Sequence, residues 1–272
     1  MGHVFDYNES RKYEQWREEA RTQAGFDREM LLFRRMVRPA FGDTLLDVGC
    51  GTGLRLLAFR EIGLRVIGVD PSPSMLEVAE RNAGRQVELH RASAEDLPFD
   101  DNAFNYACVI HTLEFTEDPA VALEEIFRVT KDRVFIGILN RQSFRGARLR
   151  LSRRFTRNVW RHARLFSVWE LHRTIRGIAP NFTVDWCAFC HFRVPMARRF
   201  KAPNPVWFPC KNPVHPFIGL SVTLTPRFRT RPLQLECPAD PPTGAVTSGL
   251  ARTRSRTRKR NWRPHNGGSI SI

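Results

Sequence analysis

A short apolar run that ends in closely spaced glycines constrains this chain more than any other feature. Residues 44–48 form a run of strand length, and Gly49, Gly51 and Gly53 follow it directly. Glycines at such a place let the chain turn sharply and let a ligand approach the main chain. The helix expected over 54–62 would point its free N–H groups at that ligand. The pattern predicts a buried strand, a binding turn and a helix.

Further apolar runs alternate with helical patterns along the chain. Continuous apolar strands that alternate with helices are typical of an α/β fold with a doubly wound, mostly parallel sheet. About seven strands are expected, and the stretch 192–216 is rich in proline and is expected to be irregular. The remaining expected strands cover 64–69, 87–90, 104–110, 134–139, 182–186 and 217–225, with helices over 8–38, 72–81 and 118–129 and a basic helical segment over 141–178.

The residues around the turn favour a cationic nucleoside over a phosphorylated ligand. Leu54 stands where a dinucleotide-binding turn has its last glycine, and no Lys-Ser or Lys-Thr pair follows the turn. Asp47 would repel a pyrophosphate but suits a ligand with a cationic end. Asp70, at the end of the second strand, can accept both hydroxyls of a ribose. These features predict S-adenosylmethionine, which joins adenosine to a sulfonium and an ammonium.

Three stretches together resemble a known family. LLDVGCGTG, VIGVDPSPSMLEVAE and ASAEDLPFDDNAFNYACVIHTLEF occur in this order, and they closely resemble the class I S-adenosylmethionine-dependent methyltransferases. The resemblance is to the branch with ubiquinone/menaquinone-type and other small-molecule enzymes; it covers about 8–225 and is strong over 43–140. It implies a Rossmann-like sheet with an antiparallel last strand, N-terminal helices and a helical cap insertion. It also implies methyl transfer to oxygen, nitrogen or carbon of a small or lipid-like molecule.

The resemblance further implies which residues bind the cofactor. Many relatives have an acid at Ser93 and an Asp at Asn105, so Glu95 or Asp96 is expected to take over recognition of the adenine amine. The methionine part is expected at Asp47, Gly49, Cys50, Gly51 and Gly53; the adenosine part at Asp70, Pro71, Ser72 and Met75, with Ala94, Glu95 and Asp96 over the adenine; and the reactive methyl beside Ile110 and His111.

Catalysis and substrate access point to a few further residues. His111 is the candidate base, because it ends the fourth strand at the ligand-binding edge and its pKa suits neutral pH; the alternative is a hydrogen-bonding role only. Tyr7, Tyr13 and Trp16 are expected in a lid over the cofactor, with core packing as the alternative for the last two. Asn140 and Arg141 are expected to contact substrate, at the start of the cap.

Positive charge is concentrated in the second half of the chain. The formal net charge is +15, although residues 1–140 are slightly acidic, because 141–201 and 226–272 are strongly basic. These segments could contact nucleic acid or an anionic membrane surface, or they could be merely solvated. Two alternatives therefore stay open: an enzyme that methylates RNA or DNA, and a non-catalytic cofactor-binding module that binds a partner.

The sequence also predicts regions and a compartment. We expect a helical lid over 1–42, a cofactor-binding core over 43–140, a basic cap insertion with the last two strands over 141–225, and a disordered basic tail over 226–272. No apolar run has the length of a membrane-spanning helix and no secretory signal is visible, so a cytoplasmic protein with reduced cysteines is expected. We expect no metal; zinc at Cys187, Cys190, His191, Cys210 and His215 is the alternative.

Overall fold

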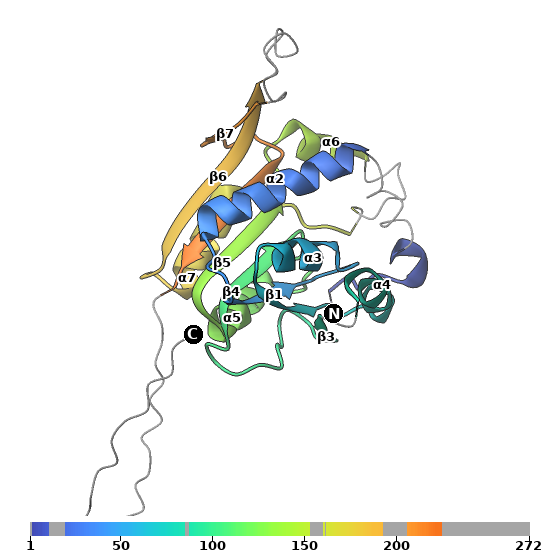
Figure 1. Ribbon diagram of the computed structural model, residues 1–272. Helices are drawn as coiled ribbons and strands as arrows, with labels where there is room; N and C mark the ends of the chain where they lie inside the picture. The colour runs from blue at the N-terminus through green and yellow to red at the C-terminus, as the bar shows by residue number, and fades with distance from the viewer. Residues whose placement is uncertain are drawn as a thin grey trace, which may run out of the picture. The chain divides into compact units, whose positions relative to one another are not determined.

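An eight-stranded mixed sheet forms the centre of the computed structural model (Figure 1). The structure describes residues 2–10, 20–84, 87–152, 160, 162–192 and 206–224. The strands are β1 (Thr44–Val48), β2 (Arg65–Val69), β3 (Glu88–His90), β4 (Phe104–Ile110), β5 (Thr130–Leu139), β6 (Thr183–Phe192), β7 (Val206–Cys210) and β8 (Phe217–Thr223). The helices are α2 (Ala20–Val37), α3 (Leu54–Glu61), α4 (Pro73–Ala83), α5 (Pro119–Val129), α6 (Phe144–Ser152) and α7 (Val168–Ile178).

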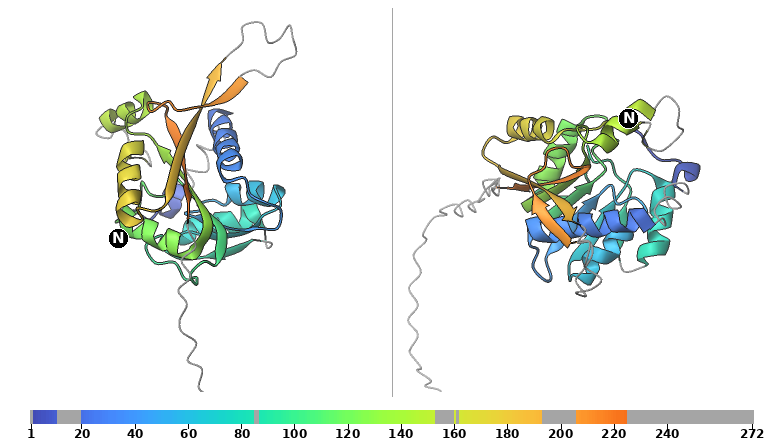
Figure 2. Two further views of the ribbon diagram at one scale, coloured as in Figure 1. Left: turned by 90° about the vertical axis from the view of Figure 1, so that its left-hand side faces the viewer. Right: turned by 90° about the horizontal axis from the view of Figure 1, so that it is seen from above.

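The strand order is β3-β2-β1-β4-β5-β8-β6-β7. Strands β1 to β5 pair in parallel, whereas β8 runs antiparallel to both of its neighbours, β5 and β6. The predicted α/β class and the antiparallel last strand are therefore confirmed. Helix α2 crosses one face of the sheet, and α5 and α7 cover the other (Figures 1 and 2).

The expected irregular stretch over 192–216 contains a strand, so this part of the prediction is wrong. Strand β6 continues to Phe192, five residues beyond Cys187, and its second half pairs antiparallel with β7. Pro209 is tolerated there because β7 is an edge strand with one neighbour. The sheet has eight strands rather than seven for this reason.

Two helices begin as their sequences predict. The Ser72 hydroxyl accepts a hydrogen bond from the Met75 N–H at 3.2 Å, so it caps α4. The Asp118 carboxylate accepts from the Ala120 N–H at 2.8 Å, and Pro119 opens α5, where its missing N–H costs no hydrogen bond. These caps fix where the chain leaves the cofactor-facing edge of the sheet.

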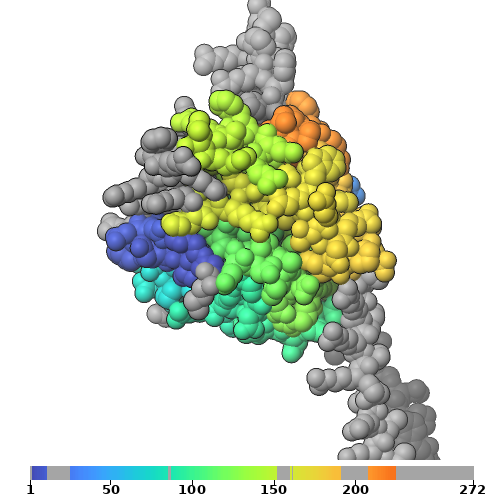
Figure 3. Space-filling model, turned by 180° about the vertical axis from the view of Figure 1, so that it is seen from behind, coloured from blue at the N-terminus to red at the C-terminus, as the bar shows by residue number. Residues whose placement is uncertain are grey.

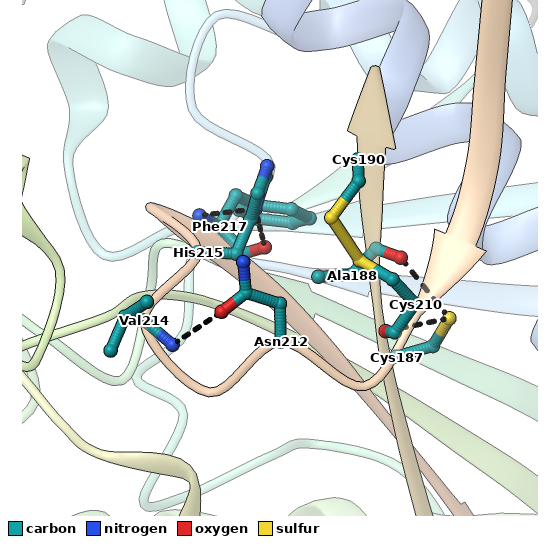
Figure 4. The surroundings of a disulfide bond; sticks show 8 residues. All are labelled: Cys187, Ala188, Cys190, Cys210, Asn212, Val214, His215 and Phe217. Carbon is teal, nitrogen blue, oxygen red and sulfur yellow. Dashed lines mark hydrogen bonds between the residues drawn. A yellow bond between two sulfur atoms is a disulfide. The ribbon is translucent and has the colours of Figure 1, made fainter. Parts of the chain in front are cut away.

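One pair of cysteines is joined by a disulfide in this structure, in contrast to the expected reduced thiols. Cys190 of β6 and Cys210 of β7 form a disulfide, with their Cα atoms 6.1 Å apart (Figure 4). Neighbouring antiparallel strands bring the two residues within disulfide range, and this proximity follows from β7, which the sequence did not reveal. The other cysteines that the structure describes, Cys50, Cys108 and Cys187, are buried thiols.

Several predictions of regions fall partly outside the described residues. Residues 7–10 are helical and α2 follows, while Tyr13, Trp16 and the tail over 226–272 lie outside the described ranges. The region boundaries after residues 42, 140 and 225 stay predictions. Among the helices that the structure describes, none combines the length and apolarity needed to cross a membrane.

Phe33 joins α2 to the sheet and to α3. Its ring is fully buried and lies edge-on to Phe59 and Phe135, with centroids 4.7 and 5.7 Å away. We expect Phe33→Ala to lower the free energy of unfolding by about 3–5 kcal/mol, because the cavity cannot close between two rigid rings. The exposed Leu31 on the same helix is the matched control, and Leu31→Ala should cost about 0.5 kcal/mol or less. Urea titration measures both; equal losses would contradict this role of Phe33.

Candidate active site

A cavity opens at the carboxyl edge of the sheet, where β1, β2 and β4 end. Seven of the predicted site residues line it: Gly49, Gly51, Asp70, Pro71, Met75, Ile110 and His111. Six lining residues were not predicted: His3, Phe5, Arg55, Thr112, Phe115 and Trp160.

The glycine turn brings the main chain to the wall of this cavity. Gly49 has φ +71°, and a Cβ there would lie 2.3 Å from the Thr112 hydroxyl oxygen, so only glycine fits. Gly51 has φ +55°, and a Cβ there would meet no atom within 4 Å, because this residue faces the open cavity. The turn therefore offers a ligand direct access to the backbone, as its sequence predicts.

Asp70 presents a buried carboxylate to the same cavity. Its two oxygens accept hydrogen bonds from the N–H groups of Gly51 at 3.0 Å and Ser72 at 2.9 Å. Burial raises the pKa of Asp70 to about 6, against the lowering effect of these two hydrogen bonds. Each carboxylate oxygen can accept a further hydrogen bond, so two hydroxyls of a ligand could be held here.

Asp47 is the least satisfied charged group of the site. The residue is 0% exposed, and neither carboxylate oxygen has a hydrogen-bond partner among the described residues. The nearest cation is Arg55, whose Nε lies 3.8 Å from Asp47 Oδ2. Burial raises the pKa of Asp47 to about 6, with Arg55 opposing the rise and Asp70 and Glu29 adding to it.

His111 is held between two carboxylates at the end of β4. Its Nε2 lies 3.2 Å from Glu29 of α2, and its Nδ1 lies 3.5 Å from Glu114. Burial alone would lower the pKa of His111, but the two carboxylates outweigh it and raise the pKa to about 9. The raised pKa favours the imidazolium at neutral pH, unlike the expected pKa near neutrality, and the role of His111 as a base stays a prediction.

The charges beneath the cavity do not cancel. Arg55 lies 3.9 Å from Glu29 and donates to the Ile110 carbonyl at 3.4 Å. Among the described residues, Arg55 pairs with Asp47 and Glu29, His111 pairs with Glu29 and Glu114, and Arg28 adds a third cation beside Glu29, so the four carboxylates, Asp70 included, outnumber these cations. An excess of buried negative charge favours a ligand that carries positive charge.

The N-terminal residues close one side of the cavity. The His3 N–H donates to the Phe115 carbonyl at 3.0 Å, and the Ser72 hydroxyl donates to the Phe5 carbonyl at 2.7 Å. The Phe5 and Phe115 rings meet edge to face at 5.0 Å, and the Trp160 ring lies 5.8 Å from Phe115. Figure 3 shows this segment, coloured dark blue, at the surface beside the yellow segment that follows residue 160.

Several predicted site residues do not line the cavity. Tyr7 points to solvent, and Arg141 pairs with Glu170 at 3.3 Å. Asn140 is buried, and its amide nitrogen donates to the Pro213 and His215 carbonyls, so it holds a loop. Glu95 accepts from the Ser93 hydroxyl and the Glu117 N–H, so each of its oxygens already holds one hydrogen bond. The others that lie off the lining are Asp47, Cys50, Gly53, Ser72, Ala94 and Asp96.

Neither of two candidate metal-binding groups has suitable geometry. The zinc alternative at Cys187, Cys190, His191, Cys210 and His215 is not assembled in this structure, because Cys190 and Cys210 are joined in a disulfide (Figure 4). His3, Glu9 and His162 bring ligand atoms within 4.8 Å of one another. The two imidazoles, however, stack 4.3 Å apart with an 11° angle between their planes. Their in-plane lone pairs run parallel and do not converge on one ion.

Comparison with known proteins shows that part of this chain is similar to methyltransferases. Residues 46–136 match the family described as "Methyltransferase domain". The demethylmenaquinone methyltransferase of Clavibacter sepedonicus is 39% identical over 99 residues, which are 36% of this chain and 40% of that protein. The 2-phytyl-1,4-naphtoquinone methyltransferase of Trichormus variabilis is 38% identical over 117 residues, 38% of this chain and 51% of that protein. The chain thus matches about half or less of the length of either relative.

Solved structures share the fold. A Thermotoga maritima protein described as an S-adenosylmethionine-dependent methyltransferase, "possible histamine N-methyltransferase", superposes with a TM-score of 0.59 over 80% of this chain and 96% of its own, at 24% identity. At that identity the likeness is one of fold alone. Residues 46–136, which include the glycine turn, thus match a methyltransferase domain, and the fold around them is shared with solved S-adenosylmethionine-dependent methyltransferases.

Proposed function

We propose that this chain is an S-adenosylmethionine-dependent methyltransferase that acts on a small or lipid-like acceptor. The observation that carries the proposal is the buried Asp47 carboxylate, which accepts no hydrogen bond from the described residues and lies beneath an open glycine turn. A buried carboxylate without hydrogen bonds is costly, and a sulfonium and an ammonium nearby would offset that cost.

The residues present fit this cofactor. Asp70 would hold the two ribose hydroxyls, and Pro71 and Met75 would flank the adenine, since all three line the cavity beside the turn. The main chain at Gly49 and Gly51 would contact the methionine part, with Asp47 as the nearby counter-charge. Recognition of the adenine amine by Glu95 or Asp96 stays a prediction, since each Glu95 oxygen already accepts one hydrogen bond and can accept another.

The cofactor supplies a methyl group that its sulfonium already activates, so the protein needs mainly to align the acceptor and exclude water. His3, Phe5 and Phe115 would exclude water, because they close the cavity from the N-terminal side. His111 would face the acceptor as a cation that Glu29 and Glu114 hold in place. It would thus attract an acceptor oxygen that has already released its proton to water, or a carbon of the same anion whose ring proton leaves to water after the transfer. Ile110 would lie beside the reacting methyl.

A planar acceptor suits the aromatic wall. Phe115 and Trp160 present ring faces and edges next to His111, whose own ring lies 5.5 Å from Trp160. The two relatives named above act, by their names, on naphthoquinone-type compounds. We therefore include a reduced quinone ring, with or without a lipid tail, in the proposed acceptor class.

The two alternative functions remain distinguishable. Methylation of RNA or DNA would use the basic segment over 141–201, of which the structure describes α6, α7 and part of β6. In the described part of this segment, no arrangement of side chains indicates that it binds nucleic acid. A non-catalytic module would bind the cofactor and transfer nothing, so labelled methyl transfer to a demethylnaphthoquinol separates it from the enzyme.

Asp47→Asn tests both the binding of the cofactor and the folding free energy that the buried carboxylate costs. Because burial raises the pKa of Asp47 to about 6, the ionised carboxylate costs folding free energy above that pH. At pH 8 we expect Asp47→Asn to unfold at the same or a higher temperature, yet to bind S-adenosylmethionine at least tenfold more weakly by calorimetry. Asp70→Ala should also lose binding. The exposed carboxylate of Glu77 on α4 is the control, and Glu77→Gln should change neither property. Saturable binding that is equal in all variants would refute the proposed site.

We place the protein in the cytoplasm as part of the proposal. Support comes from the three buried free thiols, Cys50, Cys108 and Cys187, which are typical of a reducing compartment. The Cys190–Cys210 disulfide should then be reduced in cells and form on oxidation. Rapid alkylation of cell lysate followed by mass spectrometry should find both cysteines alkylated. A fully oxidised pair would argue for an oxidising compartment.

The charge of His111 predicts a pH dependence of stability. Its folded pKa of about 9 lies above the value of about 6.5 for a free histidine, so its pairing stabilises the fold fully below pH 6.5 and is lost as pH rises through 9. Imidazole NMR signals of His111 should titrate with a midpoint near 9. Glu29→Gln should lower that midpoint and flatten the loss of stability between pH 7 and 10, whereas Glu77→Gln should not. A midpoint near 6.5 in the unaltered chain would contradict this assignment.

A further inference from the structure

A second cavity lies at the opposite end of the sheet from the cofactor cleft. Its volume is about 480 Å³. The cleft lies where β4 ends, whereas this cavity lies over Arg133 near the start of β5 and Thr183 at the start of β6. Thr223 of the antiparallel β8 pairs with both, so three strands place one row of side chains across its floor.

The wall of this cavity carries an excess of positive charge. Arg35 and Arg38 come from the end of α2, Arg133 from β5, and Lys211 from the residue after β7. The one acid in the lining, Asp185, is paired with Lys211. Three guanidinium groups therefore remain over a floor of hydroxyl-bearing residues, an arrangement of hydrogen-bond donors that suits an anion.

Ser221 provides an independent sign of a ligand. It lies on β8, between Phe135 of β5 and Asp185 of β6, and it lines the cavity although it is only 6% exposed. Its hydroxyl has no hydrogen-bond partner within the described ranges. Because Ser221 lines the cavity, an oxygen of a bound molecule could accept a hydrogen bond from this hydroxyl.

Two of the arginines are held in place by the end of α2. One terminal nitrogen of Arg133 donates to the Met36 and Val37 carbonyls at 3.3 and 2.9 Å, which fixes its guanidinium while its other nitrogens stay available. Arg38 ends the helix with φ +52°, a left-handed conformation in which glycine would be strain-free. An arginine retained there places a cation at the cavity at the expense of backbone strain.

We propose that this cavity binds the dianionic phosphate of a small organic phosphate ester. A guanidinium group can donate two parallel hydrogen bonds to two oxygens of one phosphate. The hydroxyls of Ser221 and the neighbouring threonines would donate to the remaining oxygens. The cavity is larger than a phosphate ion, so there is room for the organic part of the ester. This part would lie along Met36 and along Cys187 of β6 and Cys210 of β7, where the two strands pair (Figure 4). This site does not depend on the proposed methyl transfer.

Calorimetric titration of the full chain at low ionic strength tests the site, with inorganic phosphate and glycerol 3-phosphate as probes and glycerol as the uncharged control. We expect saturable binding of both anions, tighter for the ester, and none of glycerol. Arg38→Gly should weaken phosphate binding about tenfold or more while keeping or raising the melting temperature, because it removes a charged hydrogen bond and backbone strain together. Ser221→Ala should also weaken binding.

Arg34→Gln is the matched control, since this exposed residue sits one turn earlier on α2 and does not line the cavity. It should leave phosphate binding unchanged. Equal losses in Arg34→Gln and Arg38→Gly would show nonspecific charge attraction and overturn the site. Absence of binding to either soluble anion would also overturn it. Binding only to vesicles that contain phosphatidic acid would replace the soluble ester by a lipid headgroup and refute the proposal as stated.

Discussion

The burial of the Asp47 carboxylate at the end of β1 sets the electrostatics on which the cleft depends. A bare buried charge is unstable, so a cation must lie close to it, and α3 supplies Arg55 from its first turn. A cation at a helix N-terminus is itself unfavourable. Glu29 of α2 compensates it and also binds His111 at the end of β4. One buried carboxylate without hydrogen bonds thus links two helices and two strands at the same edge of the sheet.

The parallel half of the fold could be predicted because its signals are local. Apolar runs, capping residues such as Ser72 and Asp118, and glycines at a strand end are each visible within a few positions. Strand β7 could not be predicted, because Pro209 hides it and only its pairing with β6 makes it a strand. The disulfide between Cys190 and Cys210 was missed for the same reason.

The site was predictable only where its residues lie within the motifs. Gly49, Gly51 and Asp70 line the cavity as expected, but His3 and Phe5 reach it from far along the chain without any periodic signal. The pKa of His111 depends on Glu29, 82 residues away, so no local reading could find the imidazolium. Arg55 offered one clue, since a basic residue in the first turn of a helix usually has an acidic neighbour in space.

The two cavities follow from one topological feature. Parallel strands bring their carboxyl ends together, and that edge holds the turn, Asp70 and His111. Antiparallel β8 instead brings its own carboxyl end to the amino ends of β5 and β6, where Arg133 and Thr223 meet. At each edge one residue departs from its local optimum: Asp47 is buried without hydrogen bonds, and Arg38 adopts a glycine conformation. A cationic ligand at one edge would offset the cost of burying the Asp47 carboxylate. At the other edge the guanidinium groups of Arg35, Arg38 and Arg133 favour an anionic ligand.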